Sequence, residues 1–129
     1  MYRLRVKRDF IARHFLIGGD WGPENEENSH HFTLELILEG TDLNEHGYLV
    51  DIVTVGDALD RFVLRYRDTV LNHHDSFAGR NPSVEVFATV AWNEIVPHLA
   101  EHTVTAATVR MWEEDVAYAE YSNEVNRDR

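Results

Sequence analysis

Residues 27–38 read ENSHHFTLELIL, and apolar and polar side chains alternate along this stretch from His31 onward. Alternation with a period of two is typical of a strand with one buried face. Asn28 and His30 share the parity of the apolar residues, whereas His31 has the opposite parity. We therefore expect a long strand over 31–39 with His30 at the edge of the core. The side chains expected on the apolar face are Phe32, Leu34, Leu36 and Leu38.

The segment from Tyr2 to Leu16 alternates in the same way and predicts a second long strand, with His14 on its apolar face. Between the two strands, residues 17–27 hold three glycines, one proline and four acids, a composition typical of a loop. Two long strands joined by a loop suggest an antiparallel pair, in which His14 and His30 approach each other beside Asn28. Such a pair of imidazoles is either part of a metal site or an ordinary feature of strand ends, and the residues alone leave both interpretations open.

The middle of the chain predicts two helices. Apolar residues recur every three or four positions after Asp51, which is well placed as a helix N-cap. The buried stripe expected for this helix is Ile52, Val55, Leu59, Phe62, Val63 and Tyr66. A loop at 74–82 precedes a second helix that begins near Ser83, its expected N-cap, and that Pro97 ends or kinks. The stripe expected there is Val84, Phe87, Val90, Ala91, Ile95 and Leu99.

Two more strands are expected at about 105–112 and 116–121. The order β-β-α-α-β-β predicts one α+β domain over residues 1–121, followed by a polar tail at 122–129. A chain of 129 residues with 43% hydrophobic side chains suits a single globular domain.

Composition also excludes several functions. The chain has no cysteine, so it has no disulfide, no cysteine–zinc site and no thiol nucleophile. A formal net charge of -11 makes binding to a nucleic-acid backbone an improbable main function. The apolar runs are too short for a membrane span, and the N-terminal MYRLRVKRDF lacks the apolar region of a signal peptide. We expect a cytoplasmic protein whose partners include neither nucleic acid nor membrane.

Six short motifs together carry a family resemblance. In chain order they are FIARHFL (10–16), NSHHFTLELILEG (28–40), GYLVDI (47–52), LN (71–72), NPSVEVFA (81–88) and VRMWEEDVAYAEY (109–121). With the order of elements, they resemble the 6-pyruvoyl-tetrahydropterin synthase and 6-carboxy-tetrahydropterin synthase family over roughly residues 3–121. The resemblance implies the tunnelling fold, a four-stranded antiparallel sheet with two helices on one face. It also implies a homohexamer, two trimers stacked into a barrel, with sites between subunits.

The resemblance implies a zinc ion on His14 and His30, and it places Asn28 at the third ligand position, where the family has a histidine. Because a neutral carboxamide is a poor zinc ligand, we expect the purified protein to carry little zinc. The loop that holds the family's catalytic cysteine contains acids such as Glu24 here. The family's Asp-His pair corresponds to Arg67 and Asp68. No catalytic residue is therefore assigned.

Glu113 takes the family position that grips the pterin ring. A carboxylate accepts two hydrogen bonds from the amino-pyrimidine edge of a pterin or guanine-like ring. Without the resemblance, the run WEED (112–115) is better interpreted as a solvated charge run near a turn. Ser83 is a second candidate ligand contact, and helix capping explains it at least as well. We expect a retained pterin-type site and a lost zinc-dependent synthase reaction; the alternative is a working carbon–oxygen lyase with zinc on His14 and His30 and a substitute base.

Overall fold

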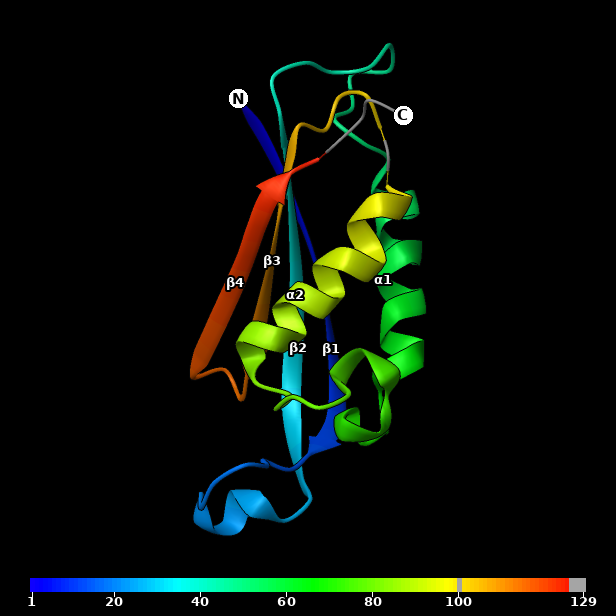
Figure 1. Cartoon of the computed structure of the whole chain (residues 1–129). Coiled ribbons are helices and arrows are strands. Elements are labelled where there is room, and N and C mark those ends of the chain that lie inside the picture. The colour runs from blue at the N-terminus through cyan, green and yellow to red at the C-terminus, as the bar shows by residue number, and fades with distance from the viewer. Residues whose placement is uncertain (100, 126–129) are drawn as a thin grey trace.

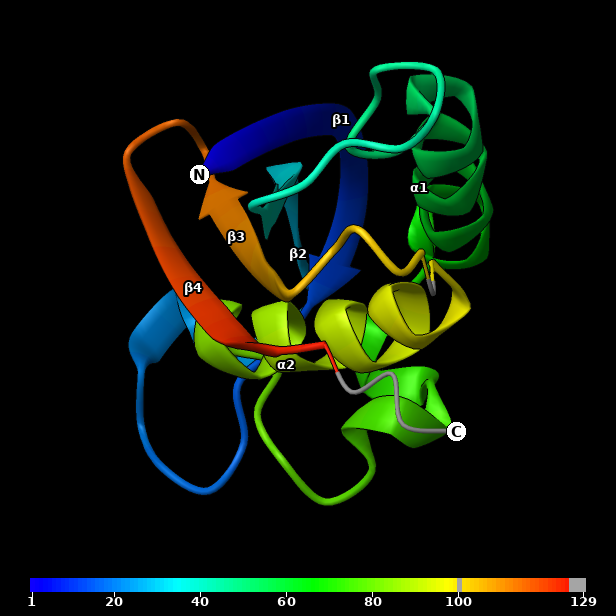
Figure 2. The same cartoon turned by 90° about the horizontal axis from the view of Figure 1, so that it is seen from above.

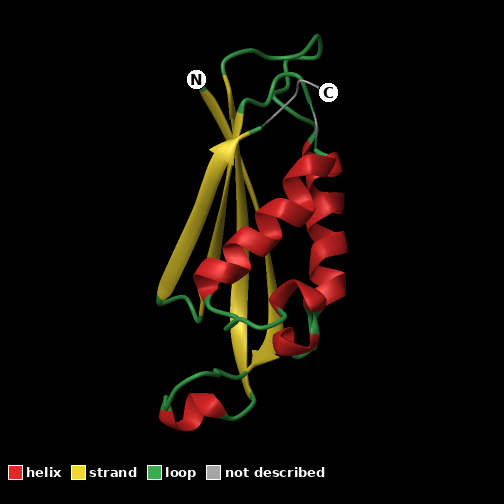
Figure 3. Cartoon of the chain, viewed as in Figure 1, coloured by secondary structure: helices red, strands yellow, loops and turns green. Residues whose placement is uncertain are grey.

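The computed structural model of the chain describes residues 1–99 and 101–125. Within them the predicted order β-β-α-α-β-β is confirmed, as one antiparallel four-stranded sheet with the strand order β1-β2-β3-β4. Both helices cover the same face of this sheet (Figures 1 and 3). Neither helix of the described chain has the length and apolar character that a membrane crossing needs. The bounds are β1 Tyr2–His14, β2 Asn28–Gly40, α1 Ile52–Tyr66, α2 Val84–Ile95, β3 Ala106–Glu113 and β4 Ala117–Glu124.

The long hairpin of β1 and β2 has the predicted parity. Its antiparallel register places Phe10 opposite Phe32, Ala12 opposite His30 and His14 opposite Asn28. The apolar side chains predicted for β2 are all buried under the helices. The strand begins at Asn28, three residues earlier than predicted, because the β1 partners of residues 28–30 continue the ladder to His14. The hairpin therefore carries both histidines at one end of the sheet.

The two helices begin as predicted. Asp51 caps α1 by accepting a hydrogen bond from the Val53 amide at 2.9 Å, and Ser83 caps α2 by accepting one from the Val86 amide at 3.1 Å. The α-helical part of α2 ends at Ile95 and a single 3-10 turn that contains Pro97 follows, because proline cannot continue the hydrogen-bond ladder. In α1 the predicted stripe is buried except at two positions: Val63 is half-buried, and Ile52 is exposed in the first turn, where it lines a surface groove.

The helices and the sheet enclose one apolar core. Helix α1 packs on β1, and α2 crosses β3 and β4 (Figure 2). Phe87 of α2 is fully buried at the centre of an aromatic cluster, with ring centroids 5.2–5.9 Å from those of five neighbours. These neighbours are Phe10, Phe32, Phe62, Tyr66 and Phe77. Strand β4 runs to Glu124, beyond the predicted end at Tyr121, and residues 126–129 of the expected tail lie outside the described residues.

The sheet face without helices is less open than the alternation suggests. Glu35 and Thr33 have the polar parity, yet they are only 5% and 6% exposed. The Trp112 indole donates a hydrogen bond to Glu35 at 2.6 Å, and Arg5 and Arg110 form ion pairs with the same carboxylate. Long neighbouring side chains thus bury a carboxylate that alternation alone predicts in solvent.

Tyr66 closes α1 with a buried polar contact. Its side chain is fully buried, and its hydroxyl donates to Glu94 at 2.5 Å and lies 2.9 Å from the Ser76 hydroxyl. Burial, and then the hydrogen bond to Glu94, raise the pKa of Tyr66 to about 12. The phenol is therefore held in its protonated form by the folded protein.

The free energy of unfolding is expected to fall as the pH rises from about 10 to about 12. The unfolded chain releases the tyrosine proton near its ordinary pKa of about 10, whereas folded Tyr66 keeps it until about 12. The unfolded state then binds fewer protons, so stability of the order of 2 kcal/mol is present below pH ~10 and lost above it. Urea unfolding at about pH 9 and about pH 11.5 measures the loss. Tyr66→Phe is the control, and an equal loss in both proteins would contradict the assignment.

Candidate functional site

Two histidines meet at the end of the sheet where β1 ends and β2 begins, opposite the N-terminus (Figure 1). His14 is the last residue of β1, and His30 lies near the start of β2 on the same face. Their ring centroids are 4.7 Å apart, and both rings pack edge-on against Phe32. The prediction that these histidines approach each other is confirmed, whereas their metal-binding role stays a prediction.

His14 is buried and His30 is half-buried, and three of their four ring nitrogens lack a hydrogen-bond partner among the described residues. The side chains of His14 and His30 are 4% and 16% exposed. Among the described residues, these three nitrogens are both nitrogens of His14 and the Nε2 of His30. Burial, and then the neighbouring His30, lower the pKa of His14; Glu113, Glu24 and the Pro82 carbonyl oppose this shift weakly. His14 is therefore a neutral imidazole at pH 7, the form that binds metals.

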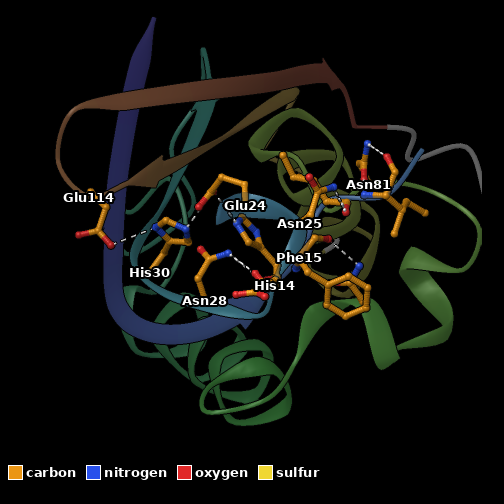
Figure 4. A network of polar contacts seen from close by, with 12 residues as sticks. His14, Phe15, Glu24, Asn25, Asn28, His30, Asn81 and Glu114 are labelled. Carbon is orange, nitrogen blue, oxygen red and sulfur yellow. Dashed lines mark hydrogen bonds and ion pairs between the residues drawn. The ribbon is translucent and has the colours of Figure 1, made fainter. Parts of the chain in front are cut away.

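Glu24 reaches this pair from the loop between β1 and β2. Its Oε1 atom lies 3.5 Å from the Nε2 of His30 and 3.8 Å from the Nε2 of His14 (Figure 4). The loop is held by Asn25, whose side-chain amide donates to the carbonyls of Leu16 and Gly19, and by the Leu16 amide, which donates to the Glu24 carbonyl. The family resemblance placed Glu24 in the loop between the first two strands without giving the direction of its side chain. The fold brings its carboxylate to the histidines.

Asn28 holds the hairpin together at the third ligand position of the family. Its side-chain NH2 group donates to the carbonyls of His14 and Glu26, at 3.2 and 2.8 Å. Its Oδ1 atom is buried without a hydrogen-bond partner in the described chain. Asn28 thus has a structural role that any ligand role would have to share.

Glu113 and Glu114 approach the histidines from the end of β3. An oxygen of Glu113 lies within 4.8 Å of a nitrogen of each histidine, and its half-buried carboxylate forms no hydrogen bond or ion pair within residues 1–99 and 101–125. Glu114 adopts a left-handed conformation, with φ 57°, in the turn to β4. Its Oε1 lies 3.3 Å from the Nδ1 of His30 and accepts a hydrogen bond from the His31 amide, which is the main cause of the lowered pKa of Glu114.

Three residues singled out by the sequence lie apart from these contacts. Arg67 is the C-cap of α1, and the amide of Asp68 donates to the Ile11 carbonyl at 2.7 Å, so Asp68 anchors the end of the helix to the edge strand β1. Among the described residues, no hydrogen bond or ion pair joins their side chains to the histidines. The Ser83 hydroxyl is occupied as the cap of α2, although the preceding Pro82 carbonyl lies beside His14. Glu114 is the site residue that sequence reasoning missed.

The donor set suits a divalent metal. Two imidazoles present nitrogens without partners, one of them is held neutral, and carboxylates of Glu24 and Glu113 lie beside them. Nitrogen and carboxylate oxygen are ordinary zinc ligands, and catalytic zinc sites commonly use three such groups. The residues present therefore fit the metal that the family resemblance implies, with a carboxylate available in place of the third histidine.

Known structures share this fold. The 6-pyruvoyl tetrahydropterin synthase of Caenorhabditis elegans superposes with a TM-score of 0.81 at 14% identity, covering 95% of both chains. The Plasmodium vivax synthase gives 0.79 at 14% identity, covering 96% of this chain and 98% of its own. Two mutants of the P. vivax synthase replace a glutamate described as a catalytic residue.

A more distant structure, a dihydroneopterin aldolase from Burkholderia thailendensis bound to guanine, gives a TM-score of 0.51 at 12% identity, covering 97% of this chain and 92% of its own. At such identities the similarity shows the fold alone. A search of curated proteins found no match. The sequence profile described as 6-pyruvoyl tetrahydropterin synthase matches residues 3–124, which is nearly the whole chain. The chain therefore belongs to the 6-pyruvoyl tetrahydropterin synthase family.

Proposed function

We propose that this chain binds a pterin or guanine-like ring through Glu113 and does not run the family's zinc-dependent synthase reaction at the rate of active members. The observation that carries the proposal is the Glu113 carboxylate itself. It is half-buried at the end of β3, beside the histidine pair, and no described residue donates a hydrogen bond to it. A partly buried carboxylate without donors is a place where a ligand with N–H groups is stabilised.

The chemistry of the ring complements a carboxylate. The amino-pyrimidine edge of a pterin or guanine presents a ring N–H beside an amino group, and the two oxygens of Glu113 match this pair as bidentate acceptors. The family membership supports the pterin class, and the guanine in the B. thailendensis aldolase supports the wider class of fused rings. Ser83 is a secondary candidate contact, because it follows Pro82 at the edge of the site.

The proposed assembly is a homohexamer of two trimers. In a single chain β1 and β4 form the two edges of the sheet, and each leaves one side of its backbone without a strand partner. Unpaired edges of this length favour pairing with another chain, and joining β1 of one copy to β4 of the next closes a ring without leaving an edge. Such a closed assembly would place the β3–β4 turn of one copy near the neighbouring copy, which supports a binding site for the pterin or guanine-like ligand between subunits.

Glu113→Gln is expected to weaken binding of the ring by roughly 10- to 100-fold, because a hydrogen bond to a charged group contributes about 1.5–3 kcal/mol. Calorimetric titration with a panel of pterins and guanine measures this. Glu45→Gln is the matched control, since Glu45 is exposed in the loop at the opposite end of the sheet. If the wild type binds no member of the panel, or if Glu113→Gln binds as well as the wild type, Glu113 does not anchor a ring.

A second candidate function is a carbon–oxygen lyase in which Glu24 replaces the missing base. The contact of Glu24 with both histidines favours it, and the catalytic glutamate of the P. vivax synthase supports the use of a carboxylate within the fold. A metal bound to His14 and His30 would polarise a substrate oxygen as a Lewis acid. In this case Glu24→Gln keeps its affinity for the pterin ring and for the metal. It loses turnover of dihydroneopterin triphosphate, the substrate that the family resemblance implies. Unchanged turnover in Glu24→Gln would exclude Glu24 as the base.

A further inference from the structure

We propose that Glu24 is the third protein ligand of a divalent metal, in a site made of two histidines and one carboxylate, and that Glu114 positions His30 for it. The substitution of the third histidine by Asn28 is then offset by a residue from a different segment of the chain. The inference concerns metal binding alone and holds whether or not Glu113 binds a ring.

The separations around Glu24 are close to those of a metal site. A single oxygen, Oε1, lies 3.5 Å from the Nε2 of His30 and 3.8 Å from the Nε2 of His14 (Figure 4). In a tetrahedral zinc site with bonds of about 2.0–2.1 Å, ligand atoms are roughly 3.3 Å apart. Both contacts of Glu24 would reach that separation if they shortened by a few tenths of an ångström.

Glu114 determines which nitrogen of His30 faces Glu24. The contact of 3.3 Å between Glu114 Oε1 and the Nδ1 of His30 favours the proton on Nδ1, so the Nε2 atom presents its lone pair. Glu114 is itself held by the hydrogen bond from the His31 amide at 2.8 Å. A carboxylate that binds the distal nitrogen of a histidine is the usual second partner of a metal-bound imidazole, and it orients the ring.

The lone pair then requires a cation. With the proton on Nδ1, two acceptors, the Nε2 of His30 and the Oε1 of Glu24, face each other at 3.5 Å, where like partial charges repel even though the Glu24 side chain is 41% exposed. The Nε2 of His14, 4% exposed and without a partner, is the third acceptor directed at the same oxygen. A metal ion bound between them removes this repulsion and satisfies all three atoms at once.

Cobalt(II) and zinc binding to the chelator-treated protein tests the proposal. Wild type is expected to bind one ion per chain, with the visible bands of low-coordinate cobalt. Glu24→Gln should lower the affinity by about 100-fold or more, and Glu114→Gln by about 10- to 100-fold, the range typical of a residue that orients a ligand. Glu26→Gln, an exposed glutamate in the same loop, should leave the affinity unchanged. Circular dichroism of the metal-free variants checks that each is folded.

Three results would overturn the inference. Wild type that binds no ion shows that these three atoms do not form a metal site. Equal affinity in Glu24→Gln and Glu26→Gln shows that Glu24 is not a ligand. A loss in Glu113→Gln with no loss in Glu24→Gln assigns the third position to Glu113, whose oxygen also lies within 4.8 Å of both histidine nitrogens. If Glu113→Gln loses ligand binding and keeps its metal affinity, Glu113 anchors the ligand and Glu24 remains the metal ligand. The two proposals can therefore fail separately.

Discussion

Turnover of dihydroneopterin triphosphate by this chain is expected to be about 10²- to 10⁴-fold slower than by family members with the full catalytic set. The chain has no cysteine, and the family resemblance places Arg67 and Asp68 at the positions of the Asp-His pair. Arg67 is the C-cap of α1, the Asp68 amide holds this end of the helix against β1, and no described contact directs either side chain at the histidine pair. Loss of a positioned acid–base group typically costs about that factor.

The measurement is steady-state product formation, with and without added zinc, beside an active family member. The zinc arm matters because a slow rate has two separable causes, an empty metal site and a missing base. If zinc restores a rate comparable to that of the active enzyme, the missing base is not limiting and the prediction is wrong. In that case Glu24→Gln decides whether Glu24 supplies the proton transfer, since a base variant binds zinc normally whereas a ligand variant does not.

The alternation of apolar and polar side chains predicted most of the sheet. Because strand side chains alternate, the run from Phe32 to Leu38 predicted one buried face, and a shift of one residue would have reversed every assignment. The same alternation predicted His14 and His30 on the core side of the sheet, and the structure confirms this prediction. Helix starts were predictable because Asp51 and Ser83 cap through local hydrogen bonds, which depend on the next few residues alone.

Parity does not describe what other strands do to an outward side chain. Glu35 has the polar parity of an exposed residue but is buried by Trp112, Arg5 and Arg110 from both neighbouring strands. Ile52 has helical spacing to the core stripe, yet it lies in the first turn of α1 and is exposed. Both differences depend on which segments lie beside the residue, and a single element's pattern does not contain that information.

The site residues differ in the same way. Glu24 and Glu114 belong to a loop and a turn, where no periodicity fixes the direction of a side chain. The position of Glu114 depends on the β2–β3 register that pairs Phe32 with Glu113, and on a left-handed residue in the turn. Either carboxylate alone reads as a solvated acid in a chain with net charge -11. They become candidates only because the sheet brings both to His30.

The core beneath the site gives the largest expected effect on stability. Phe87→Ala is expected to lower the free energy of unfolding by about 3–5 kcal/mol, because it removes a fully buried ring and leaves a cavity. Five of the neighbours of Phe87 are rigid aromatic rings, which cannot change shape to fill the space. Urea unfolding at a fixed protein concentration measures the change, since association would otherwise shift it.

The same substitution connects the core to the site. Phe87 packs edge-on against Phe32 at 5.2 Å, and Phe32 in turn supports the rings of His14 and His30. Loss of the Phe87 ring should therefore loosen the histidine pair and weaken metal binding in the protein that remains folded. Phe87→Leu, which keeps most of the volume, should cost less than Phe87→Ala, and Val116→Ala, at a side chain 83% exposed in the β3–β4 turn, should change stability by under about 0.5 kcal/mol. If Phe87→Ala is no more destabilising than Val116→Ala, the aromatic cluster does not support the fold as argued, and the rigidity of the site must come from the loop that holds Glu24.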